Sequence, residues 1–133
     1  MSRSRPRPRR ILLADDEDAV QAAVRRVAAK FGHEIISATR GSTVVEQAAH
    51  TNPDAIVLDI EFPDADGRDL LAALKRDPRT AHIPVLGWSG RKSNSSDSRI
   101  ALDLGAEDYV EKDDAQLMLR KLGRIFLKFD DEP

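Results

Sequence analysis

The chain of 133 residues contains no cysteine, and this absence excludes several kinds of site. Without thiols the chain cannot form a disulfide framework, nor can it bind zinc or an iron–sulfur cluster through thiolates. It also has no apolar stretch close to the roughly 20 residues that a membrane helix needs. Its first ten residues lack the apolar segment of a secretion signal. We therefore expect a protein of the reducing cytoplasm with no membrane contact, and its length suits a single domain.

Positive charge is concentrated at the start of the chain, where five arginines lie within the first ten residues. This segment alternates arginine, proline and serine and has no apolar residue after Met1, so we expect residues 1–10 to form a disordered tail. The whole chain has a formal net charge of -2, so the remainder is more acidic than that value. An acidic domain argues against a nucleic-acid-binding surface. The tail is either a solvated segment or a contact for an acidic partner.

Apolar runs and helical spacing alternate along the rest of the chain. Continuous runs such as Ile11–Ala14 and Ala55–Leu58 predict strands that are buried on both faces. Apolar residues at helical spacing, as in Val20–Phe31, predict amphipathic helices between them. Five strands alternating with five helices predict a doubly wound α/β fold with a parallel sheet. The expected strands are 11–14, 34–38, 55–58, 83–88 and 108–111, and apolar residues mark helices near 20–31, 42–50, 70–77, 100–104 and 118–129.

Two further segments have a biased composition. Residues 91–98 are polar and rich in serine, which predicts a mobile loop before the fourth helix. Residues 130–133 form a short acidic end that we expect to be a second tail. The folded domain is therefore expected to span residues 11–129.

Four of the expected strands are followed by side chains suited to metal or phosphate chemistry. Asp15 and Asp16 follow the first strand, Asp59 the third, Ser89 the fourth and Lys112 the fifth. The carboxyl ends of parallel strands lie along one edge of such a sheet, where ligands bind, so we expect these side chains to converge. Three carboxylates form an oxygen site for a hard cation such as Mg²⁺ or Mn²⁺. A phosphoryl group is the natural companion of that ion.

The order and spacing of these residues resemble the receiver domains of bacterial two-component response regulators. The acidic pair Asp15-Asp16 is similar to the metal-binding pair of that family, and Asp59, with the loop Phe62–Gly67 after it, is similar to its phosphoacceptor. The resemblance covers about residues 10–129. It implies a flavodoxin-like receiver fold and phosphorelay signalling in the cytoplasm. In that role the chain would accept a phosphoryl group from a sensor histidine kinase or a histidine phosphotransfer protein.

The resemblance also assigns roles to residues of the later strands. Ser89 stands where the family has a switch hydroxyl, Tyr109 where it has a switch aromatic residue, and Lys112 where it has its lysine. A carboxylate such as that of Asp59 can act as a nucleophile and form an acyl phosphate. Ser89 and Lys112 can donate hydrogen bonds to the phosphoryl oxygens. Movement of Ser89 toward the phosphoryl group would open space for Tyr109 to turn inward.

For the cation we expect Asp16, Asp59 and a backbone carbonyl near Glu61 to be ligands, with Asp15 acting through a bound water or orienting Asp16. Glu61 is also expected to affect the lifetime of the phosphorylated state. By resemblance, the fourth helix, fifth strand and fifth helix form the output face, where a downstream protein or a second copy of the chain would bind. A receiver of this kind is a phosphoacceptor that can dephosphorylate itself, and it is not expected to be an enzyme with turnover.

One feature departs from the family. The lysine of receiver domains is usually followed by a proline in a cis peptide bond, whereas Lys112 is followed by Asp113 and Asp114. A cis bond before a residue other than proline costs about 2.5–4 kcal/mol, so we expect a trans Lys112-Asp113 bond. The two aspartates can cap the last helix, and their charge can draw Lys112 away from the site.

Other functions are compatible with parts of the pattern. A pseudo-receiver would use the same fold as a docking module without phosphorylation. A phosphatase of the haloacid dehalogenase type needs a second aspartate two residues after the first, where this chain has Glu61. A flavodoxin-like electron carrier would have its flavin phosphate repelled by Asp15, Asp16 and Glu17. The histidines lack the spacing of metal ligands and are expected to be structural or exposed; they are His33, His50 and His82.

Overall fold

Five short strands form the centre of the fold, because their residues are apolar on both faces of the sheet. The structure, a computed structural model, describes residues 8–89, 95–112 and 114–130. All five strands are parallel, in the order β2-β1-β3-β4-β5, so the predicted doubly wound fold is confirmed. Every residue of β3 and β4 is buried. The strands are β1 (Arg10–Ala14), β2 (Glu34–Ala38), β3 (Ala55–Asp59), β4 (Val85–Ser89) and β5 (Asp108–Glu111).

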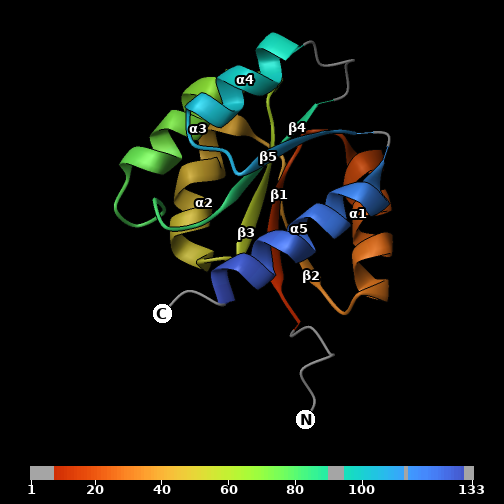
Figure 1. The fold of residues 1–133 in the computed structure, drawn as a ribbon. Coiled ribbons are helices and arrows are strands. Elements are labelled where there is room, and N and C mark those ends of the chain that lie inside the picture. Colours follow the sequence, from red (N-terminus) through yellow and green to blue (C-terminus); the bar gives the residue numbers. More distant parts are fainter. Residues whose placement is uncertain (1–7, 90–94, 113, 131–133) are drawn as a thin grey trace.

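In the part of the chain that the structure describes, five α-helices cover the two faces of this sheet (Figure 1), and a short 3-10 helix, Gly41–Thr43, precedes the second of them. The helices α1 and α5 pack on one face, over a core that includes Val24, Met118 and Leu122. The helices α2, α3 and α4 pack on the other, over a core that includes Val44 and Leu71. No helix in the described part of the chain combines the length and apolarity needed to cross a membrane. The helices are α1 (Asp18–Lys30), α2 (Val44–Thr51), α3 (Gly67–Arg76), α4 (Ser95–Asp103) and α5 (Ala115–Asp130).

The fourth helix begins earlier than the sequence predicted. We expected a loop over residues 91–98, but α4 begins at Ser95, so the prediction is wrong for residues 95–98. Serine and aspartate compete with the backbone for hydrogen bonds in the middle of a helix and favour its first turn, and the loop prediction gave that preference too little weight. Residues 91–94 lie outside the described residues. The fourth strand differs in the other direction, since it begins at Val85 instead of residue 83.

The ends of the domain also differ from the expected boundaries. Arg9, which we assigned to the disordered tail, is only 7% exposed, and its backbone N–H donates to His33 Nδ1 at 3.1 Å. Its guanidinium pairs with Asp130 and lies 4.7 Å from the ring centre of Phe126. The helix α5 reaches Asp130, which we assigned to the acidic tail. The folded part therefore includes Arg9, Arg10 and Asp130, whereas residues 1–7 and 131–133 lie outside the described residues.

The histidines lie away from the sheet edge that carries the acidic residues. The ring of His33 stacks on Phe31 and meets the ring of Phe126 edge to face, and its burial, together with the nearby Arg9, lowers its pKa. His50 and His82 are exposed, so the three residues have the structural or solvent-facing positions that we expected.

The buried pair between Arg9 and Asp130 makes a testable contribution to stability. We expect Asp130→Asn to lower the free energy of unfolding by about 1–2 kcal/mol, because it leaves a buried guanidinium without its charged partner. The loss is smaller than for a fully buried pair, because the side chain of Asp130 is 35% exposed. Urea denaturation measures the change. The matched control is Glu34→Gln, since Glu34 pairs with Arg10 at 3.8 Å on the exposed surface. That variant should lose less than about 0.5 kcal/mol, and equal losses in the two variants would contradict the prediction.

Candidate functional site

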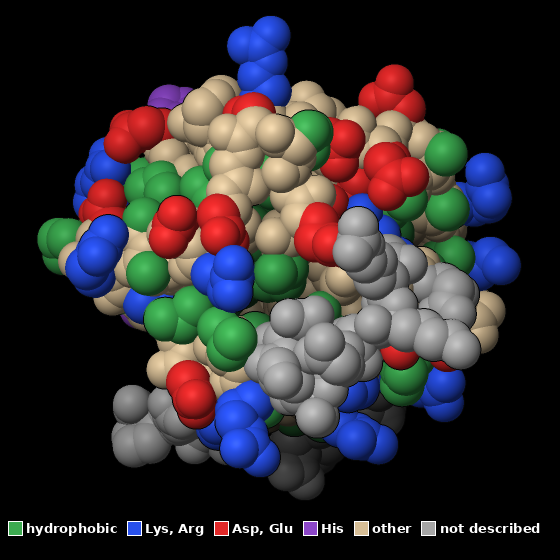
Figure 2. Space-filling view, turned by 90° about the horizontal axis from the view of Figure 1, so that it is seen from above, with side chains coloured by type: hydrophobic (Ala, Val, Ile, Leu, Met, Phe, Trp, Pro, Cys, Tyr) green, Lys and Arg blue, Asp and Glu red, His purple; other side chains and the backbone are tan. Residues whose placement is uncertain are grey.

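The carboxyl ends of four strands bring the expected side chains to one edge of the sheet. Asp59 is the last residue of β3, and Ser89 is the last residue of β4. The ladder continues one residue past two strands, since the N–H of Asp15 donates to the carbonyl of Ala38 at 2.9 Å and that of Lys112 donates to the carbonyl of Ser89 at 2.8 Å. These backbone hydrogen bonds hold the Cα positions of Asp15 and Lys112 at the edge of the sheet. Figure 2 looks onto this edge and shows that Asp and Glu side chains gather there.

Asp59 lies at the bottom of the site, with its side chain only 1% exposed. Its Oδ1 accepts the backbone N–H of Glu61 at 2.8 Å, and its Oδ2 accepts a hydrogen bond from Lys112 Nζ at 3.0 Å. Burial raises the pKa of the Asp59 carboxyl group, while the hydrogen bonds from Glu61 and Lys112 oppose the rise. The group is therefore a desolvated carboxylate held by two donors, which is the form in which a carboxylate can act as a nucleophile.

Lys112 joins three carboxylates. Its ammonium lies 2.8 Å from Asp15 Oδ2, 3.0 Å from Asp59 Oδ2 and 3.0 Å from Glu17 Oε1. Burial lowers the pKa of Lys112, but the hydrogen bonds to the three carboxylates outweigh burial, so its pKa is raised overall and the side chain stays charged. Lys112 thus reaches the site although no proline follows it. The bond to Asp113, which we expected to be trans, lies outside the described residues.

Asp15 and Asp16 have different surroundings although they are adjacent. Asp15 is fully buried, and its Oδ1 accepts the N–H of Glu17 at 2.8 Å. Its Oδ2 accepts the indole N–H of Trp88 at 3.0 Å as well as the contact from Lys112. Asp16 is exposed. Asp15 is therefore held directly by protein donors, whereas Asp16 faces solvent.

A candidate cation site is present beside Asp59. Carboxylate oxygens of Asp15, Asp16 and Glu17 lie within 4.8 Å of one another. Carboxylates are the ligands that Mg²⁺ and Mn²⁺ prefer, so the donor set fits such an ion. We expected Asp16, Asp59 and a carbonyl near Glu61 as ligands. In the described part of the chain the cluster contains Glu17 instead of Asp59, and Asp59 is joined to Asp15 through Lys112.

Sequence reasoning therefore missed two residues of this site. Glu17 was considered only as a charge that would repel a flavin phosphate, although its place directly after the acidic pair could have suggested a third ligand. Trp88 was treated only as a strand residue. No pattern in the sequence links it to Asp15, which lies 73 positions earlier.

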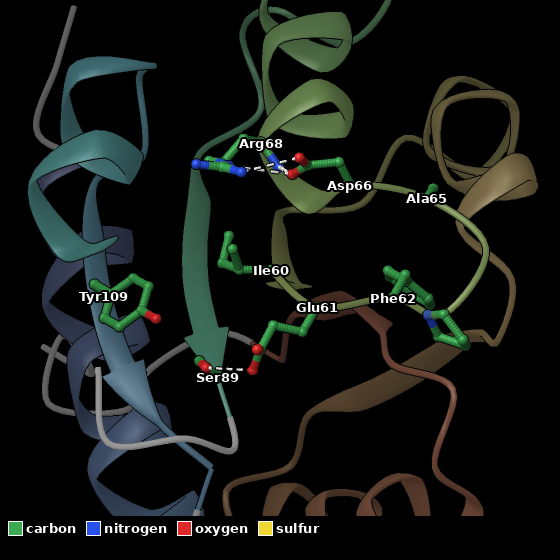
Figure 3. A pocket seen from close by; sticks show the side chains of 9 residues that line it. Ile60, Glu61, Phe62, Ala65, Asp66, Arg68, Ser89 and Tyr109 are labelled. Carbon is green, nitrogen blue, oxygen red and sulfur yellow. Dashed lines mark hydrogen bonds and ion pairs between the residues drawn. The ribbon is translucent and has the colours of Figure 1, made fainter. Parts of the chain in front are cut away.

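Ser89 and Tyr109 lie on the other side of β4 from Trp88, next to a pocket of about 530 Å³. The hydroxyl of Ser89 donates to Glu61 Oε1 at 3.1 Å, and Figure 3 shows these two side chains pointing toward each other across the pocket. Tyr109 is 8% exposed and belongs to the core on this face of the sheet. Its ring packs against Gly87, where an added Cβ would lie 2.8 Å from Tyr109 Cδ2. The glycine thus makes room for the inward ring.

The loop after Asp59 is held at both ends. The N–H of Gly67 donates to the carbonyl of Ile60 at 3.0 Å, and a Cβ on Gly67 would lie 2.3 Å from Ile60 Cα, so only glycine fits there. The carboxylate of Asp64 accepts the N–H groups of Gly41 at 2.9 Å and Ser42 at 3.2 Å, ahead of α2. The loop therefore keeps the backbone of Glu61 against Asp59.

Burial of the Asp59 charge predicts a pH dependence of stability. Because its pKa is raised in the folded state above the ordinary value of 3.8, ionised Asp59 destabilises the fold, and this effect grows as the pH rises through the folded-state pKa. We expect Asp59→Asn to have a higher Tm than the wild type at neutral pH without divalent cations. The difference should vanish in acid, where Asp59 is protonated in both states. Thermal unfolding from about pH 3 to about pH 8 measures this.

Asp66→Asn is the control, because the pKa of Asp66 is shifted in the opposite direction from that of Asp59. Hydrogen bonds from Arg68 lower the pKa of Asp66, so its contribution to stability is present at neutral pH and is lost as the pH falls through the folded-state pKa. This variant should therefore have a lower Tm than the wild type at neutral pH. An Asp59→Asn protein that is less stable than the wild type at neutral pH would be inconsistent with the burial of that charge.

The arrangement matches known proteins in sequence and in structure. The sequence profile of the response regulator receiver domain matches residues 11–123. The transcriptional regulatory protein KdpE of Mycobacterium tuberculosis is 38% identical over 102 residues, which cover 77% of this chain and 43% of KdpE. The chain thus spans less than half the length of that relative.

Solved structures of response regulators have the same fold as this chain. A response regulator from Desulfuromonas acetoxidans has a TM-score of 0.79 at 30% identity, covering 88% of this chain and 95% of that chain. The Mn²⁺-bound form of the response regulator Rcp1 has a TM-score of 0.67 at 29% identity, covering 78% of this chain and 81% of that chain. The profile match over most of the chain, with these likenesses, shows that the chain belongs to the receiver domains of two-component response regulators.

Proposed function

We propose that this receiver domain accepts a phosphoryl group on Asp59 from a histidine kinase or a histidine phosphotransfer protein. The observation that carries the proposal is the contact of one buried carboxylate, Asp59, with the ammonium of Lys112 beside a cluster of three further carboxylates. In the transfer, an oxygen of Asp59 bonds to phosphorus, the bond between phosphorus and the donor's imidazole nitrogen breaks, and that nitrogen keeps the electron pair. Phosphoryl transfer depends mainly on positioning and on charge stabilisation, which these residues supply.

The residues of the site divide this work. Lys112 is within hydrogen-bond distance of Asp59, so its ammonium can donate to an oxygen of a phosphoryl group attached there. Asp15, Asp16 and Glu17 would hold Mg²⁺ or Mn²⁺, which when bound neutralises charge on the phosphoryl oxygens. Ser89 would leave Glu61 to donate to another phosphoryl oxygen, and the bond between them is the contact that phosphorylation has to break. Glu61 therefore influences the lifetime of the phosphorylated state.

The readout surface is proposed to be formed by α4, β5 and α5. One ion pair joins β5 to α5, between Asp108 and Lys121 at 3.1 Å. Leu102 on α4 and Leu127 on α5 are exposed apolar side chains that a downstream protein or a second copy of the chain could cover. Asp59 would be modified once in each signalling cycle, so we propose a phosphoacceptor and not an enzyme with turnover.

Intact-mass measurement tests the proposed function. Incubation with a small phosphodonor such as acetyl phosphate and Mg²⁺ should add the mass of one phosphoryl group to the wild type. Asp59→Asn should gain none, because the nucleophilic oxygen is lost. Asp54→Asn is the control, since Asp54 is an exposed carboxylate at the opposite edge of the sheet that accepts the N–H of Arg10. A wild type that never gains mass would favour a pseudo-receiver that docks partners without phosphorylation.

The cation site can be tested separately through stability. Mg²⁺ binds the folded carboxylate cluster better than the unfolded chain, so it should raise the Tm, with a gain of about 2.7 kcal/mol at a concentration 100 times the Kd. Asp16→Asn should lose most of this response, because it removes one of the two exposed carboxylates of the cluster. Asp18→Asn removes an exposed charge from the first turn of α1 that is not part of the cluster, and it should keep the response. Melting that is unchanged by millimolar Mg²⁺ would rule out the site.

A further inference from the structure

Trp88 is the single tryptophan of the chain, and it connects the core to the acidic site. It lies in β4 directly before Ser89, and its side chain is fully buried. The ring packs in the core under α1 and α5, among apolar residues such as Val24 and Met118. Its indole N–H, however, donates to Asp15 Oδ2 at 3.0 Å. A residue of the hydrophobic core thus makes a direct polar contact with a candidate cation ligand.

Three donors together fix the carboxylate of Asp15. Oδ1 accepts the N–H of Glu17 at 2.8 Å, and Oδ2 accepts both the indole of Trp88 at 3.0 Å and the ammonium of Lys112 at 2.8 Å. An ionised carboxylate offers about four lone-pair sites, so about one is left for a cation. The torsion of an aspartate carboxylate is otherwise broad. The direction of the remaining lone pair is therefore set by these three donors.

Trp88 is the one side chain of these three donors for which the contact with Asp15 can be removed by a substitution that leaves Lys112 in place. The N–H of Glu17 belongs to the backbone, so a side-chain substitution does not remove it. Lys112 also contacts Asp59, so a substitution of Lys112 would change both carboxylates. The buried aliphatic and phenyl side chains of the same core have no polar atom to offer. An apolar residue at position 88 would keep the core apolar, but it would leave Asp15 with one donor fewer. The identity of this residue is therefore a matter of chemistry at Asp15 as well as of packing.

The strand gives Trp88 a rigid base for this contact. The Cα of Trp88 is paired with that of Asp59 in the sheet, and the carbonyl of Trp88 accepts the N–H of Ile60 at 3.1 Å. The backbone of Trp88 is thus held in register with β3, while its indole reaches Asp15, the residue directly after β1. The side chain of Trp88 therefore begins on a strand that is paired with β3 and ends at the carboxylate of Asp15.

We propose that Trp88 is a positioning residue of the cation site, and that its indole N–H orients Asp15 for Mg²⁺. This inference rests on the proposed function, since it concerns the ion that assists transfer to Asp59. Outer partners that orient metal ligands typically change metal affinity by about 10-fold to 100-fold when they are removed. Trp88 has the geometry of such a partner, because it is buried, hydrogen-bonded and held by a strand that is paired on both sides.

Calorimetric titration of Mg²⁺ into Trp88→Phe tests the proposal. This variant keeps an aromatic ring in the core and removes the N–H, so the Kd for Mg²⁺ should rise by about 10-fold or more. The control is Leu86→Val, because Leu86 lies on the same face of β4 and in the same core but is apolar. It should lose stability and keep the wild-type Kd. Equal Kd values in Trp88→Phe and the wild type would overturn the positioning role.

Fluorescence provides a second measurement that needs no change at position 88. Because Trp88 is the single tryptophan, its emission reports the surroundings of the indole, and it should change with Mg²⁺ at a midpoint equal to the calorimetric Kd. Asp15→Asn should abolish the change. An emission that stays constant while Mg²⁺ binds would overturn the proposal, even if Trp88→Phe failed to fold.

Intact-mass measurement separates the positioning role of Trp88 from the proposed function. Phosphorylation of Asp59 with no effect of Trp88 on Mg²⁺ affinity refutes only the positioning role. A wild type that neither binds Mg²⁺ nor gains mass refutes both.

Discussion

The arrangement of the carboxylates in the site depends on the ammonium group of Lys112, which contacts three of them. It lies within 3.0 Å of oxygens from Asp15, Glu17 and Asp59, of which Asp15 and Asp59 are buried. Buried carboxylates would repel one another strongly without a cation between them. A divalent cation at the acidic cluster would add a second positive charge to the same group. Lys112 and such a cation would therefore neutralise the same group of carboxylates.

The end of β4 distributes this site over both faces of the sheet. Trp88 points toward α1 and α5 and contacts Asp15, while Gly87 and Ser89 face the side of α3 and α4. Gly87 leaves room for the ring of Tyr109, and Ser89 contacts Glu61. Three consecutive residues thus contact Tyr109, Asp15 and Glu61 in turn. A shift of this strand end would change all three contacts together, because a packed sheet does not deform continuously.

The sequence predicted the fold well because its strands are short apolar runs that end in charged or polar residues. That pattern is local, and the rule that parallel strand ends share an edge converts it into a site containing Asp15, Asp59 and Lys112. The contacts that were missed are between distant residues. Glu17 meets Lys112 across 95 positions, and Arg9 meets Asp130 across 121 positions. Neither partner is marked by periodicity or by turn residues, so only the packed structure reveals that Arg9 belongs to the fold.

The missing proline after Lys112 shows how a receiver can position its lysine by other means. The N–H of Lys112 donates to the carbonyl of Ser89, which extends the β4–β5 ladder as far as the lysine itself. The next helix begins at Ala115, and the carboxylate of Asp114 accepts the N–H of Leu117 at 2.8 Å, so Asp114 is the cap that we expected. Its charge is thereby used by the helix and does not draw Lys112 away. With the strand fixed before the lysine and the helix fixed after it, the direction of the side chain is set without a cis-proline.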